Sequence, residues 1–206
     1  MGRQEQTNHL FSNRDLRILL VPLIVEQILN SLMGTADSIM VSNVGSAAIS
    51  AVSLVDSINI LVIQAFYALA AGGTIVCSQY IGQKDKKNAE ESARQLSFVV
   101  ACISSAVMAV CLLTRGPLLR LIFGSVEADV MEAAQIYFFY TALSFPFIAL
   151  YDAGASIFRA QENTRGPMVI SIISNVMNIG GNAVLIWVFH MGVAGAAIST
   201  LVSRIF

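Results

Sequence analysis

Apolar segments follow one another along nearly the whole chain, and most are long enough to cross a lipid bilayer. A membrane-spanning helix needs about 20 mainly apolar residues. The composition agrees, because only 12% of the residues are charged, against about 25% in an average soluble domain. We therefore predict an all-α polytopic membrane protein. The expected spans cover about 18–42, 47–80, 95–114, 133–157 and 167–189, and a sixth begins near 193.

Three of these segments have unusual lengths or borders. The sixth is too short to cross the bilayer before Phe206, so we expect the chain to be a fragment that stops within a helix. The second is longer than a simple crossing requires, and the pair Gly72-Gly73 inside it predicts a bend. Between the third and fourth spans, "PLLRLIFGSVEADVMEAA" is typical of a short amphipathic external helix and loop.

Basic residues gather on alternate connections between the spans. The first 17 residues, the loop "GQKDKKNAEESARQ" and the loop between spans 4 and 5 carry most of the lysine and arginine. The remaining connections have none, or have Arg115 and Arg120 offset by acidic residues. Because basic loops stay in the cytoplasm, we expect a cytoplasmic segment at 1–17 and a membrane lobe at 18–206. We also expect a multi-pass plasma-membrane protein with a cytoplasmic N-terminus.

Several function classes find no support in the sequence. The net charge is −1, so no basic surface indicates nucleic acid. No HExxH, GxSxG or P-loop pattern is present, so we expect neither an enzyme nor the use of ATP, and no cofactor. The three cysteines lie in apolar segments without metal-binding spacing, and we interpret them as packing residues.

The first span has a polar, acidic face. Glu26, Asn30 and Asp37 are separated by 4 and 7 residues, which places them within about 40° of one another around a helix. A carboxylate inside a span costs about 3 kcal/mol on insertion scales, so it normally faces a cavity or a partner. Pro22 precedes Glu26 by one turn and allows a kink.

The fifth span carries four polar residues on one side. Ser171, Asn175, Asn178 and Asn182 follow one another at helical spacing. One interpretation is that these side chains only hold neighbouring helices together, assisted by Gly180-Gly181. The other is that they line a site for a transported ion.

The expected depths of these residues favour the second interpretation. At a rise of about 1.5 Å per residue, Asp37, Asn182 and Thr200 all fall about 7–10 Å from the outer ends of their spans. Asn178 lies about one turn deeper. A carboxylate, two amides and a hydroxyl are ligands that suit a small hard cation or a proton relay.

Other polar residues allow more than one role. Asp56 of the second span could reach the same region or could face a partner helix. Asp152 and Arg159, seven residues apart in the fourth span, favour a structural pair near its inner end. Arg204 falls inside the sixth span, and the sequence gives no partner for it. We count Glu26, Asn30, Asp56 and Asn175 as candidate cavity-lining residues.

Several stretches resemble the multidrug and toxic compound extrusion (MATE) family. "GTADSIMVSNVG" is similar to the end of the family's first helix, and "GGTIVCSQYIGQKD" to its second helix and first inner loop. "FRAQENTRGPM" resembles the segment that joins helices 4 and 5. "NVMNIGGNAVLIWVFHMGVAGAAISTLVSR" resembles helices 5 and 6. The similarity covers about residues 15–206.

This resemblance implies a twelve-helix transporter of two lobes that exports small, often cationic, organic compounds in exchange for Na⁺ or H⁺. Asp37 matches the family's functional acid, Pro22 its helix 1 proline, and Asn178 and Asn182 its helix 5 polar pair. Thr200 matches a helix 6 hydroxyl, and Asp37 would bind the coupling ion, with no metal expected other than Na⁺ if that ion is Na⁺ rather than H⁺. A C-terminal lobe of the same polypeptide would supply the rest of the cavity, so we expect no transport by this lobe alone. Two alternatives are a flippase for lipid-linked oligosaccharides and a non-transporting membrane subunit.

Overall fold

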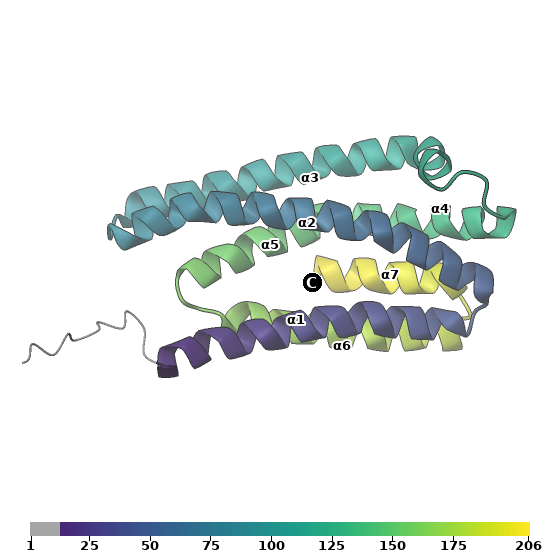
Figure 1. The fold of residues 1–206 in the computed structure, drawn as a ribbon, viewed down its shortest axis with the longest axis horizontal. Coiled ribbons are helices and arrows are strands. Elements are labelled where there is room, and N and C mark those ends of the chain that lie inside the picture. Colours follow the sequence, from purple (N-terminus) through teal and green to yellow (C-terminus); the bar gives the residue numbers. More distant parts are fainter. Residues whose placement is uncertain (1–12) are drawn as a thin grey trace, which may run out of the picture.

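The chain folds into a bundle of long helices (Figure 1). The computed structural model describes the backbone of residues 13–206, and all side chains in that range except those of residues 13–16, 19 and 30. Every element in the described part is helical. In order they are α1 (Asn13–Ser42), α2 (Ser46–Gly82), α3 (Lys86–Phe123), α4 (Ala128–Leu143), α5 (Phe145–Ala160), α6 (Arg165–Asn182), a π-helical segment η1 (Ala183–Val188) and α7 (Gly192–Ile205).

Successive spans run in opposite directions through the bundle. The start of α1, the α2–α3 turn and the α5–α6 loop lie at one end of the molecule (Figure 1). The α1–α2, α3–α4 and η1–α7 connections lie at the other end. We call these the inner and outer ends, after the predicted orientation. The lysines of the α2–α3 turn and Arg165 therefore lie at the inner end, as the loop charges indicate.

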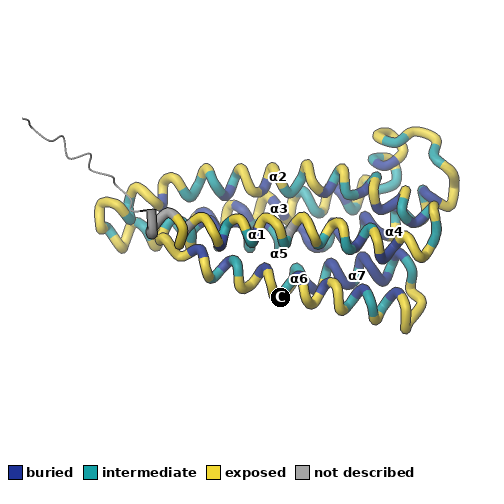
Figure 2. The backbone as a smooth tube through the Cα atoms, turned by 60° about the horizontal axis from the view of Figure 1, so that its bottom comes forward, coloured by how far each residue is buried: buried dark blue, intermediate teal, exposed yellow. Residues whose placement is uncertain are grey.

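The helices have the composition of a membrane protein. Of those described, α2, α3 and the continuous α6–η1 segment are long and apolar enough to span a membrane. Helices α4 and α5 meet the same criterion together, as one span bent by 44°. The all-α polytopic prediction is confirmed. Buried positions concentrate on α7 and the outer part of the bundle, whereas α1 is largely exposed (Figure 2).

The fourth span is broken, although the sequence predicted one uninterrupted helix over 133–157. Pro146 lies in the first turn of α5 and has no N–H to donate to the preceding turn. The hydroxyls of Thr141 and Ser144 bond to nearby backbone carbonyls; the Ser144 hydroxyl donates to the Thr141 carbonyl at 2.6 Å. Such hydroxyls are one way in which a broken helix satisfies its backbone inside a membrane.

The third span is much longer than the predicted 95–114. The basic loop is helical from Lys86, and Asp85 caps this helix by accepting a hydrogen bond from the Asn88 backbone amide at 3.2 Å. Lysine, glutamate and alanine are strong helix formers, so the helix extends beyond the apolar run. The predicted external helix is also wrong in part, because its first residues continue α3 to Phe123 and α4 begins at Ala128.

Helix α2 runs unbroken through Gly72-Gly73, where the sequence predicted a bend. Gly73 has a packing role. A Cβ atom on Gly73 would lie 2.2 Å from Cδ1 of Leu96 on α3. The glycine therefore allows α2 and α3 to approach closely, whereas a Cβ on Gly72 would meet nothing within 4 Å.

Candidate functional site

Helices α1, α6 and α7 bring four predicted site residues together near the outer end. The amide nitrogen of Asn182 donates a hydrogen bond to Oδ1 of Asp37. The same nitrogen lies 3.5 Å from Oδ1 of Asn178. The amide nitrogen of Asn178 donates in turn to the hydroxyl of Thr200 at 3.2 Å. The structure thus joins Asp37, Asn182, Asn178 and Thr200 in one chain of polar contacts, which we call the Asp37 network.

The Asp37 network is shielded from solvent. Asp37 is 4% exposed, and the other three residues are 2% exposed or less. Ser199 holds α7 against α6 beside the network, because its hydroxyl donates to the Asn178 backbone carbonyl at 2.7 Å. Gly181 makes this approach feasible, since a Cβ there would lie 2.4 Å from the Ser199 hydroxyl oxygen. Asn182 is the last residue before the π-helical segment, a feature that often accompanies functional sites.

The network leaves one of its described acceptor atoms unsatisfied. Oδ1 of Asn182 is buried and has no hydrogen-bond partner in the described structure. Asp37 contributes a carboxylate, and Thr200 and Asn178 contribute further oxygens. Among the described residues no group of three or more His, Cys, Asp or Glu side chains could hold a metal ion. One carboxylate with amide and hydroxyl oxygens is instead a set that suits a monovalent hard cation or a proton.

A cavity of about 1230 Å³ extends from the Asp37 network toward the inner half of the bundle. Asp37 and Thr200 line its outer part, and predicted cavity residues Glu26, Asp56 and Asn175 line it too. The ionisable side chains in its wall include four acids and two arginines: Glu26, Asp37, Asp56, Asp152, Arg159 and Arg204. The wall therefore has a formal excess of negative charge when all six are ionised.

Asp56 of α2 faces this cavity rather than a lipid-facing surface or a closed helix interface. The amide nitrogen of Asn59, one turn along α2, donates to Oδ1 of Asp56 at 3.3 Å. Asp56 also interacts with the phenol of the buried Tyr137 on α4. The sequence analysis gave Asn59 no role and missed Tyr137. The only signals were an amide one turn after an acid, and a hydroxyl-bearing aromatic in an apolar run.

Glu26 forms an ion pair with Arg159, whereas the sequence analysis paired Arg159 with Asp152. Arg159 on α5 donates to Oε1 of Glu26 at 3.2 Å, and the Tyr151 hydroxyl donates to the same oxygen at 2.8 Å. The predicted Asp152–Arg159 pair is therefore wrong. Residues seven positions apart in a helix are about 10 Å apart along its axis, whereas Glu26 lies directly opposite Arg159. Asp152 is 8% exposed, and its Oδ2 has no described hydrogen-bond partner.

Arg204, for which the sequence gave no partner, reaches the break between α4 and α5. Its guanidinium donates to the Ser144 hydroxyl at 2.9 Å. It is also close enough to Asp37, Asp56 and Asp152 for Coulombic interaction with each of them. The broken helix therefore positions the charge of α7 beside the acids of the cavity.

Two further sequence predictions concern α1. Pro22 lies inside α1 and is buried, and the helix continues through it. The side chain of Asn30 lies outside the part of the chain that the structure describes.

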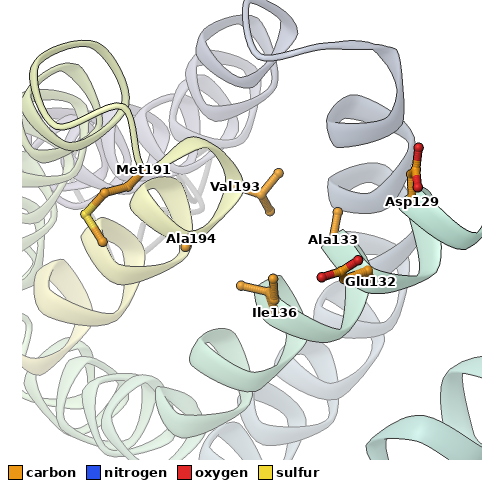
Figure 3. A pocket seen from close by; sticks show the side chains of 7 residues that line it. All are labelled: Asp129, Glu132, Ala133, Ile136, Met191, Val193 and Ala194. Carbon is orange, nitrogen blue, oxygen red and sulfur yellow. The ribbon is translucent and has the colours of Figure 1, made fainter.

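A second, smaller pocket of about 290 Å³ lies at the outer end and contains none of the predicted site residues. It is formed where the start of α4, with Asp129, Glu132 and Ile136, faces the start of α7, with Met191 and Val193 (Figure 3). Its two carboxylates come from one exposed helix turn. The Asp37 network and the large cavity are therefore the better candidates for function.

The MatE family model matches residues 22–184, which is most of the chain. The chain belongs to this family, the MATE family of multidrug and toxic compound extrusion proteins. The matched range includes Asp37, Asn178 and Asn182, and it ends before Thr200.

Curated MATE relatives share the sequence across nearly the whole chain. An uncharacterized transporter of Bacillus subtilis, YisQ, is 32% identical over 205 residues, which is 98% of this chain and 43% of the relative. A probable multidrug resistance protein of Thermotoga maritima, NorM, is 26% identical over 198 residues, which is 93% of this chain and 42% of the relative. The chain thus spans less than half the length of these relatives.

Solved MATE structures share the fold. A multidrug resistance MATE family transporter in an outward-facing conformation superposes with a TM-score of 0.86 at 22% identity. The match covers 93% of this chain and 42% of the transporter. The helical arrangement described above is therefore the fold of one portion of a MATE protein.

Proposed function

We propose that this chain is the ion-coupling lobe of an antiporter that exports small organic cations in exchange for Na⁺ or H⁺. The observation that carries the proposal is the Asp37 network at the outer part of the acidic cavity. A single buried carboxyl links α1 to α6 through Asn182, and Asn178 links α6 to α7 through Thr200. Binding of a cation there changes the contacts of three helices at once.

Such a site provides what an antiporter requires. Export needs an element with two arrangements whose affinities for the ion differ, because a ligand shifts an equilibrium only by its differential affinity. Helix α1 is the candidate element. It contains Pro22, and most of its described side chains are exposed or half-buried rather than buried in the bundle. Its Asp37 and Glu26 anchor it to the rest of the lobe.

We also propose that transport requires a second lobe, since the chain spans about 43% of its relative YisQ. The large cavity would be closed by that lobe. The lobe would sit in the plasma membrane with its basic inner end in the cytoplasm, as the distribution of lysine and arginine suggests. A phosphate-bearing lipid is a poorer substrate for this cavity. Its wall has four acids, and one of its two arginines is already paired with Glu26.

The test is ion-driven efflux in membrane vesicles. The protein is expressed from its own coding region, including any sequence beyond Phe206, and an imposed Na⁺ or H⁺ gradient drives export of a fluorescent cationic dye. We expect Asp37→Asn to abolish gradient-driven efflux while the protein still inserts into the membrane, because the amide can neither bind a cation electrostatically nor carry a proton. Asp129→Asn, at the exposed outer end, is the matched control. Efflux by Asp37→Asn at the wild-type rate would overturn the proposal.

A further inference from the structure

The wall of the large cavity contains buried acceptor atoms that no described donor satisfies. They are Oδ2 of Asp152 on α5, Oδ1 of Asn175 on α6 and Oδ1 of Asn59 on α2. The residues that carry them are 8% exposed or less. Among the described residues of this wall, one buried donor atom, Nε of Arg159, also lacks a partner. A buried acceptor left without a donor costs about 1–3 kcal/mol, so three in one cavity indicate a ligand that donates hydrogen bonds.

Asp152 differs from the other three acids of the cavity in this respect. Asp37 accepts from Asn182, Asp56 from Asn59, and Glu26 from both Tyr151 and Arg159. Asp152 has one carboxylate oxygen buried without a partner. Both arginines are close enough to act on it through their charge. However, the guanidinium of Arg159 bonds to Glu26 and that of Arg204 bonds to Ser144.

The position of Asp152 separates it from the Asp37 network. Asp152 lies toward the inner half of the cavity, close enough to Glu26 for a Coulombic interaction. Glu26 and Asp37 are 11 residues apart on α1, which corresponds to about 16 Å along the helix. A ligand at Asp152 therefore does not need to displace the ion at Asp37.

We propose that Asp152 is a substrate-binding carboxylate that receives a protonated amine, with the amide oxygen of Asn175 as a further acceptor in the same cavity. The ligand class is an organic ammonium ion that still carries N–H groups, rather than a quaternary ammonium ion. Charge attracts both classes, but only the protonated amine donates hydrogen bonds to Oδ2 of Asp152. The inference deepens the proposed function, because it names the class of cation that the exporter would hold in this lobe.

Equilibrium binding of two matched probes tests this site. The wild-type protein, expressed from its own coding region and held in lipid nanodiscs without an ion gradient, is titrated with dansylcadaverine, a protonated primary amine, and with its N-trimethyl analogue. We expect the amine to bind about tenfold more tightly or better, which is the worth of one charge-assisted hydrogen bond. Asp152→Asn should remove this preference, whereas Asp129→Asn should keep it. Equal binding of the two probes by the wild-type protein would overturn the proposal, as would an unchanged preference in Asp152→Asn.

A measurement on the wild-type protein covers the case in which Asp152→Asn does not fold. A hydrophobic carbodiimide modifies carboxyl groups within membrane proteins, and mass spectrometry locates the modified residue. We expect dansylcadaverine to protect Asp152 from modification and its N-trimethyl analogue to protect it much less. Modification of Asp152 that neither probe changes would refute the site. Because neither assay uses a gradient, a failure of ion coupling at Asp37 would leave these results unaffected.

Discussion

The four acids of the cavity differ in what surrounds them, and this difference suggests separate roles. Glu26 has both an arginine and a tyrosine, so its charge is compensated within the protein. Asp37 accepts its hydrogen bond from the neutral amide of Asn182, and Arg204 acts on it through charge without a described hydrogen bond. A compensated acid suits a structural tie between helices, whereas an acid whose hydrogen-bond partners are neutral can exchange its cation.

This reasoning predicts that Asn182 is needed for ion coupling although it carries no charge. Asn182→Leu keeps a similar volume but removes the donor to Asp37 and places apolar groups beside the carboxyl. We expect gradient-driven dye efflux to fall about tenfold or more, because a hydrogen bond to a charged group is worth about 1.5–3 kcal/mol. Gln161→Leu, in the exposed inner loop, is the control. Normal ion-driven efflux by Asn182→Leu would show that the amide does not support the charge of Asp37.

Some of these residue contacts could be predicted from the sequence, and others could not. Helical spacing placed Ser171, Asn175, Asn178 and Asn182 on one face, and all four are buried. The depths expected from helix geometry, together with the family resemblance, predicted that Asp37 and Thr200 lie in the same region. The partner of Arg159 could not be found in this way. Spacing within one helix favoured Asp152 as its partner, but in the folded lobe Arg159 pairs with Glu26 of another helix, α1.

At the scale of elements, the ion pair between Glu26 and Arg159 ties α1 to α5 near the inner end. Arg159→Met would leave the Glu26 carboxylate buried with Tyr151 as its remaining donor. Removing one partner of a buried pair costs about 3–5 kcal/mol, so we expect Tm to fall by roughly 10 °C in thermal unfolding of the detergent-solubilised protein.

Two further variants show whether this loss comes from the buried pair. Arg94→Met disrupts a matched pair with Glu91 whose side chains are 84% and 51% exposed, and it should change Tm by much less. The double variant Glu26→Gln/Arg159→Met should recover part of the loss, because no unpaired charge remains. Equal effects of Arg94→Met and Arg159→Met would contradict the tie between α1 and α5.

The close approach of α2 and α3 gives a second prediction for the elements. Gly73→Ala places a Cβ against Leu96, so either that side chain or the helices must shift, at a cost of about 1–3 kcal/mol. Gly72→Ala meets nothing within 4 Å and gains helix propensity of up to about 1 kcal/mol. Thermal unfolding should therefore show Gly73→Ala destabilised and Gly72→Ala unchanged or stabilised. Similar Tm values for the two variants would mean that Gly73 has no packing role.

Which elements form could be predicted well, but where they break and end could not. The apolar runs located every span because burial in lipid requires them. The end of α3 depended on helix-forming charged residues outside the apolar run, and the break at Ser144 depended on Pro146 within one. A hydropathy pattern contains neither kind of information. The same pattern also gave no sign that Gly73 would be a packing contact with α3.

At the scale of the whole molecule, the structure places the basic connections at one end of the bundle, and this arrangement predicts its orientation. The α2–α3 turn with its lysines shares the inner end with the α5–α6 loop, whereas the α3–α4 loop lies at the outer end (Figure 1). Because lysine and arginine near span ends are retained in the cytoplasm, the inner end should face the cytoplasm.

Single cysteines can test this orientation without any assumption about transport. In a background that lacks the three native cysteines, Gln83→Cys places a thiol in the exposed α2–α3 turn, and Ser125→Cys places one in the exposed α3–α4 loop. A membrane-impermeant maleimide added to intact cells should label Ser125→Cys at once and Gln83→Cys only after permeabilisation. The reverse pattern would invert the lobe. The Asp37 network would then lie near the cytoplasmic surface, and ions would enter the site from the opposite side.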